Sequence, residues 1–253
     1  MIEALRVAAL AVIQGVAEFL PISSSGHLVI GREVMGLSEA GMRLDVFLHV
    51  GTLVAVFAFY RKVVFRIIAM REWAYALKIV LSAVPVGIVG VLLRHQIEDA
   101  FSAPSAVACA LFFTGVVLIA TKWLRRGTKD VTWLNALVTG LAQAVAILPG
   151  ISRSGMTISA ARTMGISPAR AAEFSFLMSA PPIAGAALLD IASSSGADAA
   201  GQTPWVFVVL GGVISAAVGF LSLKVLVKTL DSDRFWMFGP YCILAAVVVF
   251  LAV

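Results

Sequence analysis

Uninterrupted runs of apolar residues recur along most of the chain. A membrane-spanning helix needs roughly 17 to 25 apolar residues, because the bilayer core is about 30 Å thick and a helix rises about 1.5 Å per residue. Six runs reach or approach this length: Leu44–Tyr60, Leu77–Leu93, Ser105–Thr121, Phe174–Leu189, Trp205–Leu223 and Trp236–Val253. The pattern therefore predicts six transmembrane helices.

Two further apolar stretches, Ala4–Ile30 and Leu134–Ala161, have proline, glycine, serine and charged residues near their middles. Proline ends or kinks a helix, so neither stretch predicts a plain span. Basic residues outside the apolar runs offer a way to decide what these stretches are, because they favour the cytoplasmic side of a membrane.

Those basic residues fall into two unequal sets. One set of connections carries Arg61, Lys62, Arg66, Arg71, Lys122, Arg125, Arg126, Lys129, Arg162, Arg170, Lys224, Lys228 and Arg234, and the opposite side carries only Arg6, Arg32, Arg43 and Arg94. The richer set is expected to be cytoplasmic. The two sets stay separate only if both interrupted stretches enter and leave on the same face. We therefore expect two re-entrant helix–loop–helix segments.

The composition agrees with an integral membrane protein of class all-α. Of 253 residues, 60% are hydrophobic and 13% are charged, and the mean hydropathy is +1.00. A soluble domain cannot bury that much apolar surface. We interpret the net charge of +5 as a signal of the protein's orientation in the membrane. The sequence has no basic stripe with interleaved aromatic residues, so a nucleic-acid partner is not expected. Cys109 and Cys242 lack any pairing pattern and are expected to be small buried residues.

The chain also repeats itself. QGVAEFLPISSSGHL (14–28) aligns without a gap on QAVAILPGISRSGMT (143–157), and the same offset aligns MGLS (35–38) with MGIS (164–167). We interpret this as a duplication within one membrane domain, with residues 1–128 as the first repeat and 129–253 as the second. Each repeat would hold one re-entrant segment and three spans, and this odd number of crossings inverts the second repeat. In inverted repeats, broken helices meet near the bilayer midplane.

The two copies differ at three positions that carry chemistry: Glu18 against Ile147, Ser24 against Arg153, and His27 against Met156. Gln14 is four residues before Glu18, so a helix places both side chains on one face. Pro21 is expected to end that helix. A buried carboxylate costs on the order of 2.5 to 3.5 kcal/mol at membrane depth, so a functional role is expected for Glu18.

Small polar residues then start a new helix in each copy. They are Ser23, Ser24, Ser25 and Gly26 in the first copy and Ser152, Ser154 and Thr157 in the second. Two helix N-termini together with Arg153 would form an anion site, and a guanidinium favours phosphate. The flanking serines have an alternative role in helix packing. His27 is expected to titrate in a reaction, whereas His49 is expected to be a satisfied interfacial residue and Asp45 a residue near a span end.

These motifs resemble a known family. QGVAEFLPISSSGH and PGISRSGMT (149–157), together with EFSFLMSAPPIAGA (173–186), resemble the bacitracin-resistance type undecaprenyl-diphosphatases over nearly the whole chain. The resemblance implies a multi-pass enzyme of the bacterial plasma membrane that hydrolyses undecaprenyl diphosphate, a polyprenyl diphosphate lipid, for peptidoglycan synthesis. It also implies a site open to the extracytoplasmic side and a need for Mg²⁺ or Ca²⁺. It leaves a homodimer open.

Carried over by motif position, the resemblance assigns the acidic-or-amide pair to Gln14 and Glu18, the serine to Ser24, the histidine to His27 and the arginine to Arg153. The neutral Gln14 departs from a pattern of two glutamates, so Glu18 and the diphosphate itself are the expected cation ligands.

Two mechanisms fit these residues. In one, Ser24 is the nucleophile and His27 its base; in the other, His27 is the nucleophile and Ser24 assists it. A rival function is a transporter or flippase of a lipid phosphate or small anion, because inverted repeats with broken helices are common in transporters. The Ser24 and His27 pair favours an enzyme. A receptor or scaffold would leave Glu18 and Arg153 without a role.

Overall fold

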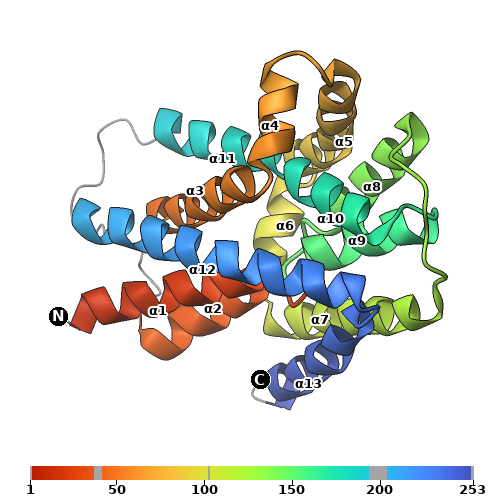
Figure 1. The fold of residues 1–253 in the computed structure, drawn as a ribbon. Helices are drawn as coiled ribbons and strands as arrows, with labels where there is room; N and C mark the ends of the chain where they lie inside the picture. Colours follow the sequence, from red (N-terminus) through yellow and green to blue (C-terminus); the bar gives the residue numbers. More distant parts are fainter. Residues whose placement is uncertain (1, 37–41, 102, 194–203, 252–253) are drawn as a thin grey trace.

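The protein is helical throughout the part that is described. The computed structural model describes residues 2–36, 42–101, 103–193 and 204–251. Over these residues the β structure is limited to an isolated parallel bridge between Lys129 and Ile166. The helices are α1 (Ile2–Ala17), α2 (Ser24–Met35), α3 (Met42–Phe59), α4 (Arg61–Ile68), α5 (Trp73–Leu92), α6 (Arg94–Phe101), α7 (Pro104–Ala120), η1 (Thr121–Trp123), α8 (Trp133–Val145), α9 (Arg153–Thr163), α10 (Pro168–Leu177), α11 (Ala180–Ser193), α12 (Trp205–Asp231), η2 (Phe235–Met237) and α13 (Phe238–Leu251) (Figure 1).

Several of these helices are long and apolar enough to cross a membrane. Four described segments qualify: Trp73–Leu92, Pro104–Trp123, Pro168–Leu188 and Trp205–Asp231. A fifth qualifies if α3 and α4, which are bent by 85° at Tyr60, count as one span. The chain is therefore a multi-pass membrane protein, and its described residues include four to five helices of spanning length.

The predicted spans correspond to helices, with two differences. The predicted span Phe174–Leu189 is divided between α10 and α11, which are separated by a break at Met178 and Ser179. The predicted span Trp236–Val253 falls on η2 and α13, and Phe235–Leu251 is one of the shorter apolar helices among the described residues. Ser38 of the repeated MGLS and the last two residues of the predicted sixth span lie outside the described residues.

Each of the two interrupted stretches forms a helical hairpin. In hairpin 1, α1 and α2 pack together across a turn at residues 18–23. In hairpin 2, α8 and α9 pack together across residues 146–152. The predicted helix–loop–helix form is therefore confirmed for both. α1 ends at Ala17, four residues before Pro21, so the turn is longer than a break at the proline alone would give.

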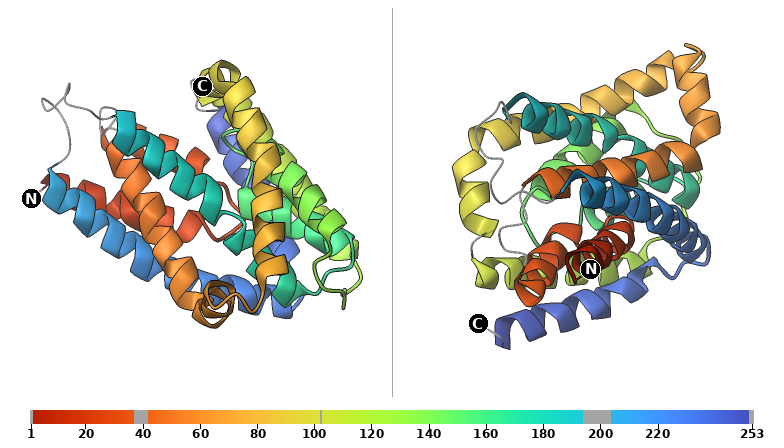
Figure 2. Two further views of the ribbon diagram at one scale, coloured as in Figure 1. Left: turned by 90° about the horizontal axis from the view of Figure 1, so that it is seen from above. Right: turned by 90° about the vertical axis from the view of Figure 1, so that its left-hand side faces the viewer.

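Each hairpin packs against a helix from the other half of the chain. The first limb of hairpin 1, α1, lies along α12, and the first limb of hairpin 2, α8, lies along α5. In the left-hand view of Figure 2, α1, α2, α3, α11 and α12 form one group, and α5 and α8 belong to a second group that diverges from it. The helices α7 and α13 also pack together.

Close helix crossings depend on small residues. At the crossing of α7 and α13, a Cβ on Gly115 would lie 2.8 Å from the Gly239 carbonyl oxygen, and a Cβ on Gly239 would lie 2.7 Å from the Gly115 carbonyl oxygen. Small residues are typical of interfaces between membrane helices, because they let the backbones approach closely. This crossing also positions the turn of hairpin 1, since Cys242 of α13 contacts the Pro21 carbonyl oxygen at 3.3 Å.

Candidate active site

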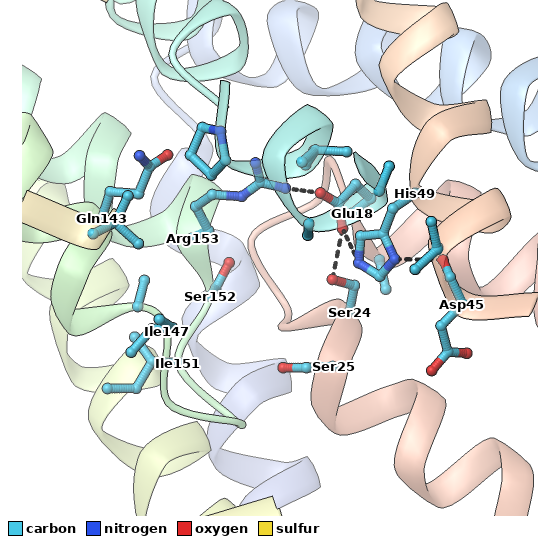
Figure 3. Close-up of a pocket in the computed structure, with 18 residues that line it drawn as sticks. Glu18, Ser24, Ser25, Asp45, His49, Gln143, Ile147, Ile151, Ser152 and Arg153 are labelled. Carbon is cyan, nitrogen blue, oxygen red and sulfur yellow. Dashed lines mark hydrogen bonds and ion pairs between the residues drawn. The ribbon is translucent and has the colours of Figure 1, made fainter. Parts of the chain in front are cut away.

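The two hairpins face a common pocket of about 360 Å³. Hairpin 1 contributes Glu18, Ser24 and Ser25, and hairpin 2 contributes Gln143, Ser152 and Arg153 (Figure 3). The helix α3 adds Asp45 and His49, and α11 adds apolar residues such as Pro182 and Ile183. A few polar groups in a largely apolar concavity are typical of a small-molecule site.

The carboxylate of Glu18 is the centre of the polar contacts in this pocket. It is 6% exposed. Its Oε2 accepts hydrogen bonds from Ser24 Oγ at 2.7 Å and from Gln14 Nε2 at 3.1 Å. The four-residue spacing of Gln14 and Glu18 therefore places the two side chains together, as the sequence predicts. Both donors orient the carboxylate, and Ser24 in turn is held with its proton directed at Glu18.

Arg153 reaches Glu18 from hairpin 2. Its guanidinium forms an ion pair with Glu18 Oε1, the oxygen that the serine and glutamine do not use (Figure 3). Arg153 is the first residue of α9, and the side chain of the preceding Ser152 accepts a hydrogen bond from Gly155 N at 3.1 Å. The N-cap serine thus fixes the start of the helix and the origin of the arginine side chain.

The turns of the two hairpins contact each other. A Cβ on Gly155 would lie 3.4 Å from Pro21 Cβ, and a Cβ on Gly26 would lie 3.7 Å from the Gly150 Cα. Gly150 has a φ of +93°, a conformation that favours glycine. The backbone of this turn is held by Thr114, whose Oγ1 donates to the Gly150 carbonyl oxygen at 3.1 Å. This contact between the turns brings Glu18, Ser24 and Arg153 into one pocket.

Two pocket residues on α3 were assigned other roles in the sequence analysis. His49, which was expected to be a satisfied interfacial residue, also lines the pocket, and its Nε2 lies 3.7 Å from Glu18 Oε2. Its Nδ1 hydrogen-bonds to the Asp45 carbonyl oxygen at 2.8 Å. Asp45 also lines the pocket and forms an ion pair with Arg32. The one signal in the sequence was the four-residue spacing of two polar residues at the start of an apolar run.

The expected pairing of Ser24 with His27 is corrected by the structure. His27 Nδ1 hydrogen-bonds to the Ser23 carbonyl oxygen at 2.8 Å, and Nε2 hydrogen-bonds to Tyr241 Oη at 2.7 Å. The His27 and Tyr241 rings also stack, with centroids 5.7 Å apart. Because both ring nitrogens are engaged by Ser23 and α13, the imidazole is directed at Tyr241, and the acceptor for the Ser24 hydroxyl is Glu18.

The remaining predicted site residues lie in or next to α2 and α9, the second helices of the two hairpins. Ser23 Oγ accepts from Gly26 N at 3.4 Å, the counterpart of the bond between Ser152 and Gly155 in hairpin 2. The paired serines also match, because Ser23 and Ser25 Oγ are 3.3 Å apart and Ser152 and Ser154 Oγ are 3.3 Å apart. Ser25 and Ser152 line the pocket. Thr157 is buried within α9, where its Oγ1 lies 2.5 Å from Ser175 Oγ.

The described residues do not form a protein-only cation site. No group of three or more histidine, cysteine, aspartate or glutamate side chains with metal-binding geometry occurs among them. Both oxygens of Glu18 are engaged, Oε1 by Arg153 and Oε2 by Ser24 and Gln14. Mg²⁺ and Ca²⁺ prefer several oxygen ligands, so the phosphates of a substrate would have to supply most of them. The need for Mg²⁺ or Ca²⁺ stays a prediction.

The fold and the pocket define a multi-pass membrane protein with a guanidinium, a carboxylate and a hydroxyl gathered at one small-molecule site. The chain belongs to the family described as Bacitracin resistance protein BacA, whose family model matches residues 7–248. It is 39% identical to an undecaprenyl-diphosphatase of Desulfatibacillum aliphaticivorans, with 98% of each chain covered. It is 37% identical to one of Halothermothrix orenii, again with 98% of each chain covered, and 34% identical to one of Methanosphaera stadtmanae, with 98% of this chain and 97% of the relative covered.

Proposed function

We propose that this protein hydrolyses undecaprenyl diphosphate to undecaprenyl phosphate and inorganic phosphate, and so supplies the lipid carrier for peptidoglycan synthesis and confers bacitracin resistance. Membership of the family and the names of the relatives support this activity. The observation that carries the chemistry is the hydrogen bond of 2.7 Å from Ser24 Oγ to Glu18 Oε2, with Arg153 on the other carboxylate oxygen. It places a hydroxyl, a proton acceptor and an anion-binding group in one pocket.

In the mechanism that we propose, the diphosphate exchanges places with Glu18 as the partner of Arg153. A guanidinium binds phosphate in the same forked geometry in which it binds a carboxylate. Once Arg153 has turned to the terminal phosphate, the charge on Glu18 is no longer neutralised by it. Glu18 is then a better acceptor for the proton of Ser24, which activates the hydroxyl for in-line attack on the terminal phosphorus. The N-terminus of α9 adds stabilisation of phosphate charge.

The alternative assignment makes His27 the nucleophile. The geometry favours Ser24, because Ser24 lines the pocket and its hydroxyl faces Glu18, whereas the His27 ring is engaged by Ser23 and Tyr241. The two assignments predict different intermediates. A phosphoserine survives acid and is lost in alkali, whereas a phosphohistidine is lost in acid. Rapid quenching with farnesyl diphosphate labelled at its terminal phosphate should trap acid-stable label on Ser24, and acid-labile label on His27 would overturn the assignment.

The activity itself is tested with purified full-length protein in detergent. We expect inorganic phosphate to be released from farnesyl or undecaprenyl diphosphate, and this release to be lost in Ser24→Ala without loss of protein from the monodisperse peak. A transporter of lipid phosphates, the alternative that the paired hairpins favour, would bind the same lipids in wild-type and Ser24→Ala protein without releasing phosphate. Binding without release would therefore reject the hydrolase.

We also propose that the two halves of the chain are inverted repeats with six spans and two re-entrant hairpins. Matched local geometry supports this. Gly36 and Gly165, at equivalent positions after α2 and α9, both have positive φ values of 62° and 81°. The contacts between the turns are reciprocal as well, since Pro21 and Gly155 in one contact correspond in the repeat to Gly150 and Gly26 in the other.

This topology would open hairpin 1 to the extracytoplasmic side of the bacterial plasma membrane. It predicts that Gln96→Cys in intact cells reacts with a membrane-impermeant maleimide and that Arg125→Cys reacts only after the membrane is broken. Labelling of Arg125→Cys in intact cells would reject the orientation.

A further inference from the structure

Gln143 is a buried amide without a hydrogen-bond partner in the described part of the chain. The residue is 2% exposed, and it lines the pocket on the wall formed by α8. Neither its Nε2 nor its Oε1 has a hydrogen-bond partner within the described residues. A buried donor or acceptor that is left unsatisfied destabilises the folded protein. An amide with both groups unsatisfied at a pocket wall therefore points to a ligand or a water that occupies the pocket during function.

The repeat explains why this amide is free. Gln14 is at the equivalent position of hairpin 1, and its Nε2 donates to Glu18 Oε2 at 3.1 Å. In hairpin 2 the position equivalent to Glu18 is Ile147, which offers no acceptor. The amide of Gln14 is thus hydrogen-bonded to a carboxylate in hairpin 1, whereas the amide of Gln143 in hairpin 2 can bind a molecule in the pocket.

Gln143 and Ser24 lie on different walls of the pocket. Gln143 comes from α8 and Ser24 from α2, and Figure 3 shows the Arg153 side chain extending between the Gln143 wall and Glu18. A phosphoryl group held by Arg153 and attacked by Ser24 would therefore have Gln143 on the side away from the serine. In-line displacement requires the leaving oxygen, and later the attacking water, to be on that side.

We infer that Gln143 binds the hydrolytic water and directs it at the phosphorus opposite Ser24. The inference rests on the proposed function with Ser24 as the nucleophile. The Oε1 atom accepts a hydrogen bond from the water, and Nε2 donates a hydrogen bond to the water or to an adjacent phosphate oxygen. A neutral amide suits this task because it orients water beside a phosphoryl group without adding negative charge, as a glutamine does in GTPases.

The proposed hydrolysis has two steps, transfer of the phosphoryl group to Ser24 and its release by water. In the first, the bond between Ser24 Oγ and the terminal phosphorus forms, the bond from that phosphorus to the bridging oxygen breaks, and the lipid monophosphate leaves with the electron pair. The serine proton passes to Glu18. In the second, the bond from the water oxygen to phosphorus forms, the bond from phosphorus to Ser24 Oγ breaks, and the proton on Glu18 returns to the serine. One proton of the water stays on the attacking oxygen and the other passes to a second phosphate oxygen, so the product leaves as dihydrogen phosphate. Gln143 acts in the second step only.

The test compares Gln143→Met, which keeps the length of the side chain but removes both polar groups, with Gln96→Met on the exposed part of α6. Full-length protein in detergent is mixed with farnesyl diphosphate labelled at its terminal phosphate, and quenched samples are analysed for farnesyl monophosphate, free phosphate and protein-bound label. For Gln143→Met we expect a first turnover of farnesyl monophosphate close to one per enzyme, a 10- to 100-fold slower release of phosphate, and label that accumulates on Ser24. Gln96→Met should behave as wild type.

Thermal unfolding separates this role from a structural one. Replacing an unsatisfied buried amide by an apolar side chain of similar shape is expected to leave the melting temperature unchanged or raised. A lowered melting temperature together with unchanged turnover would overturn the inference, and so would slower turnover without label on the protein. If wild-type protein releases no phosphate at all, the proposed function is rejected. In that case the melting temperature still tests the inference, because a lower value for Gln143→Met would show that the amide has a hydrogen-bond partner in the folded protein.

Discussion

Arg153 of hairpin 2 forms an ion pair with Glu18 of hairpin 1, so the two halves of the chain contribute opposite charges to one pocket. Neither hairpin alone has both the proposed nucleophile and the proposed anion-binding group. Ser24 is on hairpin 1 and Arg153 occupies the equivalent position on hairpin 2. The proposed duplication would therefore supply two similar scaffolds whose different side chains line a single pocket.

Removing the Arg153 guanidinium should abolish most of the activity, and a small cation of the same shape should restore part of it. We expect Arg153→Ala to lower phosphate release from farnesyl diphosphate about 10²- to 10³-fold, since a donor that stabilises transition-state charge is lost. Added guanidinium ion should restore part of this rate by entering the vacated space, whereas sodium at equal ionic strength should not. Arg61→Ala, at an exposed position on α4, is the control and should retain wild-type turnover. A loss that guanidinium does not relieve would mean that Arg153 has a structural role.

The two turns should be close enough for a disulfide to form between them. The Cβ position of Gly155 lies 3.4 Å from Pro21 Cβ, close to the separation of about 3.5 to 4.5 Å in disulfides. In a background with Cys109→Ala and Cys242→Ser, the pair Pro21→Cys and Gly155→Cys should oxidise to a disulfide, detected as a linked peptide by mass spectrometry. The control pair Pro21→Cys and Gly87→Cys should stay reduced. Two freely alkylated thiols in the first pair would contradict the contact.

The crossing of α7 and α13 should tolerate no side chain at its centre. Gly115→Ala would place a methyl group 2.8 Å from the Gly239 carbonyl oxygen, so we expect a loss of about 1 to 3 kcal/mol in unfolding free energy. Gly87→Ala is the matched control, because a Cβ there meets no atom within 4 Å and alanine is the better helix former. Detergent-titration unfolding of the two variants measures this difference. Equal stability would show that the crossing is looser than the structure describes.

The sequence predicted those parts of the site that depend on local spacing. Gln14 and Glu18 lie on one face because four residues make about one helical turn, and the N-cap serines follow from their position before each new helix. The proximity of Glu18 and Arg153 followed from the repeat, which pairs the two turns. These predictions succeeded because each rested on a geometric rule that the rest of the fold does not change.

The remaining features depend on how helices pack, and a single sequence does not show this. His49 lies beside Glu18 because α3 packs against α1, and the His27 ring is directed at Tyr241, a residue of the sequence-distant helix α13. The predicted sixth span at 236–253 falls on η2 and α13, which form one of the shorter apolar helices in the described part of the chain. Apolar composition alone cannot tell a full crossing from a shorter helix buried against its neighbours.

The most direct measurement of the shared site is a double-mutant cycle on Glu18 and Arg153. Phosphate release from farnesyl diphosphate would be measured as kcat/KM for Glu18→Gln, Arg153→Gln and the double variant. Residues that act as a unit give losses that are far from additive. If both side chains serve one phosphoryl group, the double variant should be within about threefold of the worse single variant. Two losses that multiply in the double variant would contradict the account, because they would mean that the hairpins act independently.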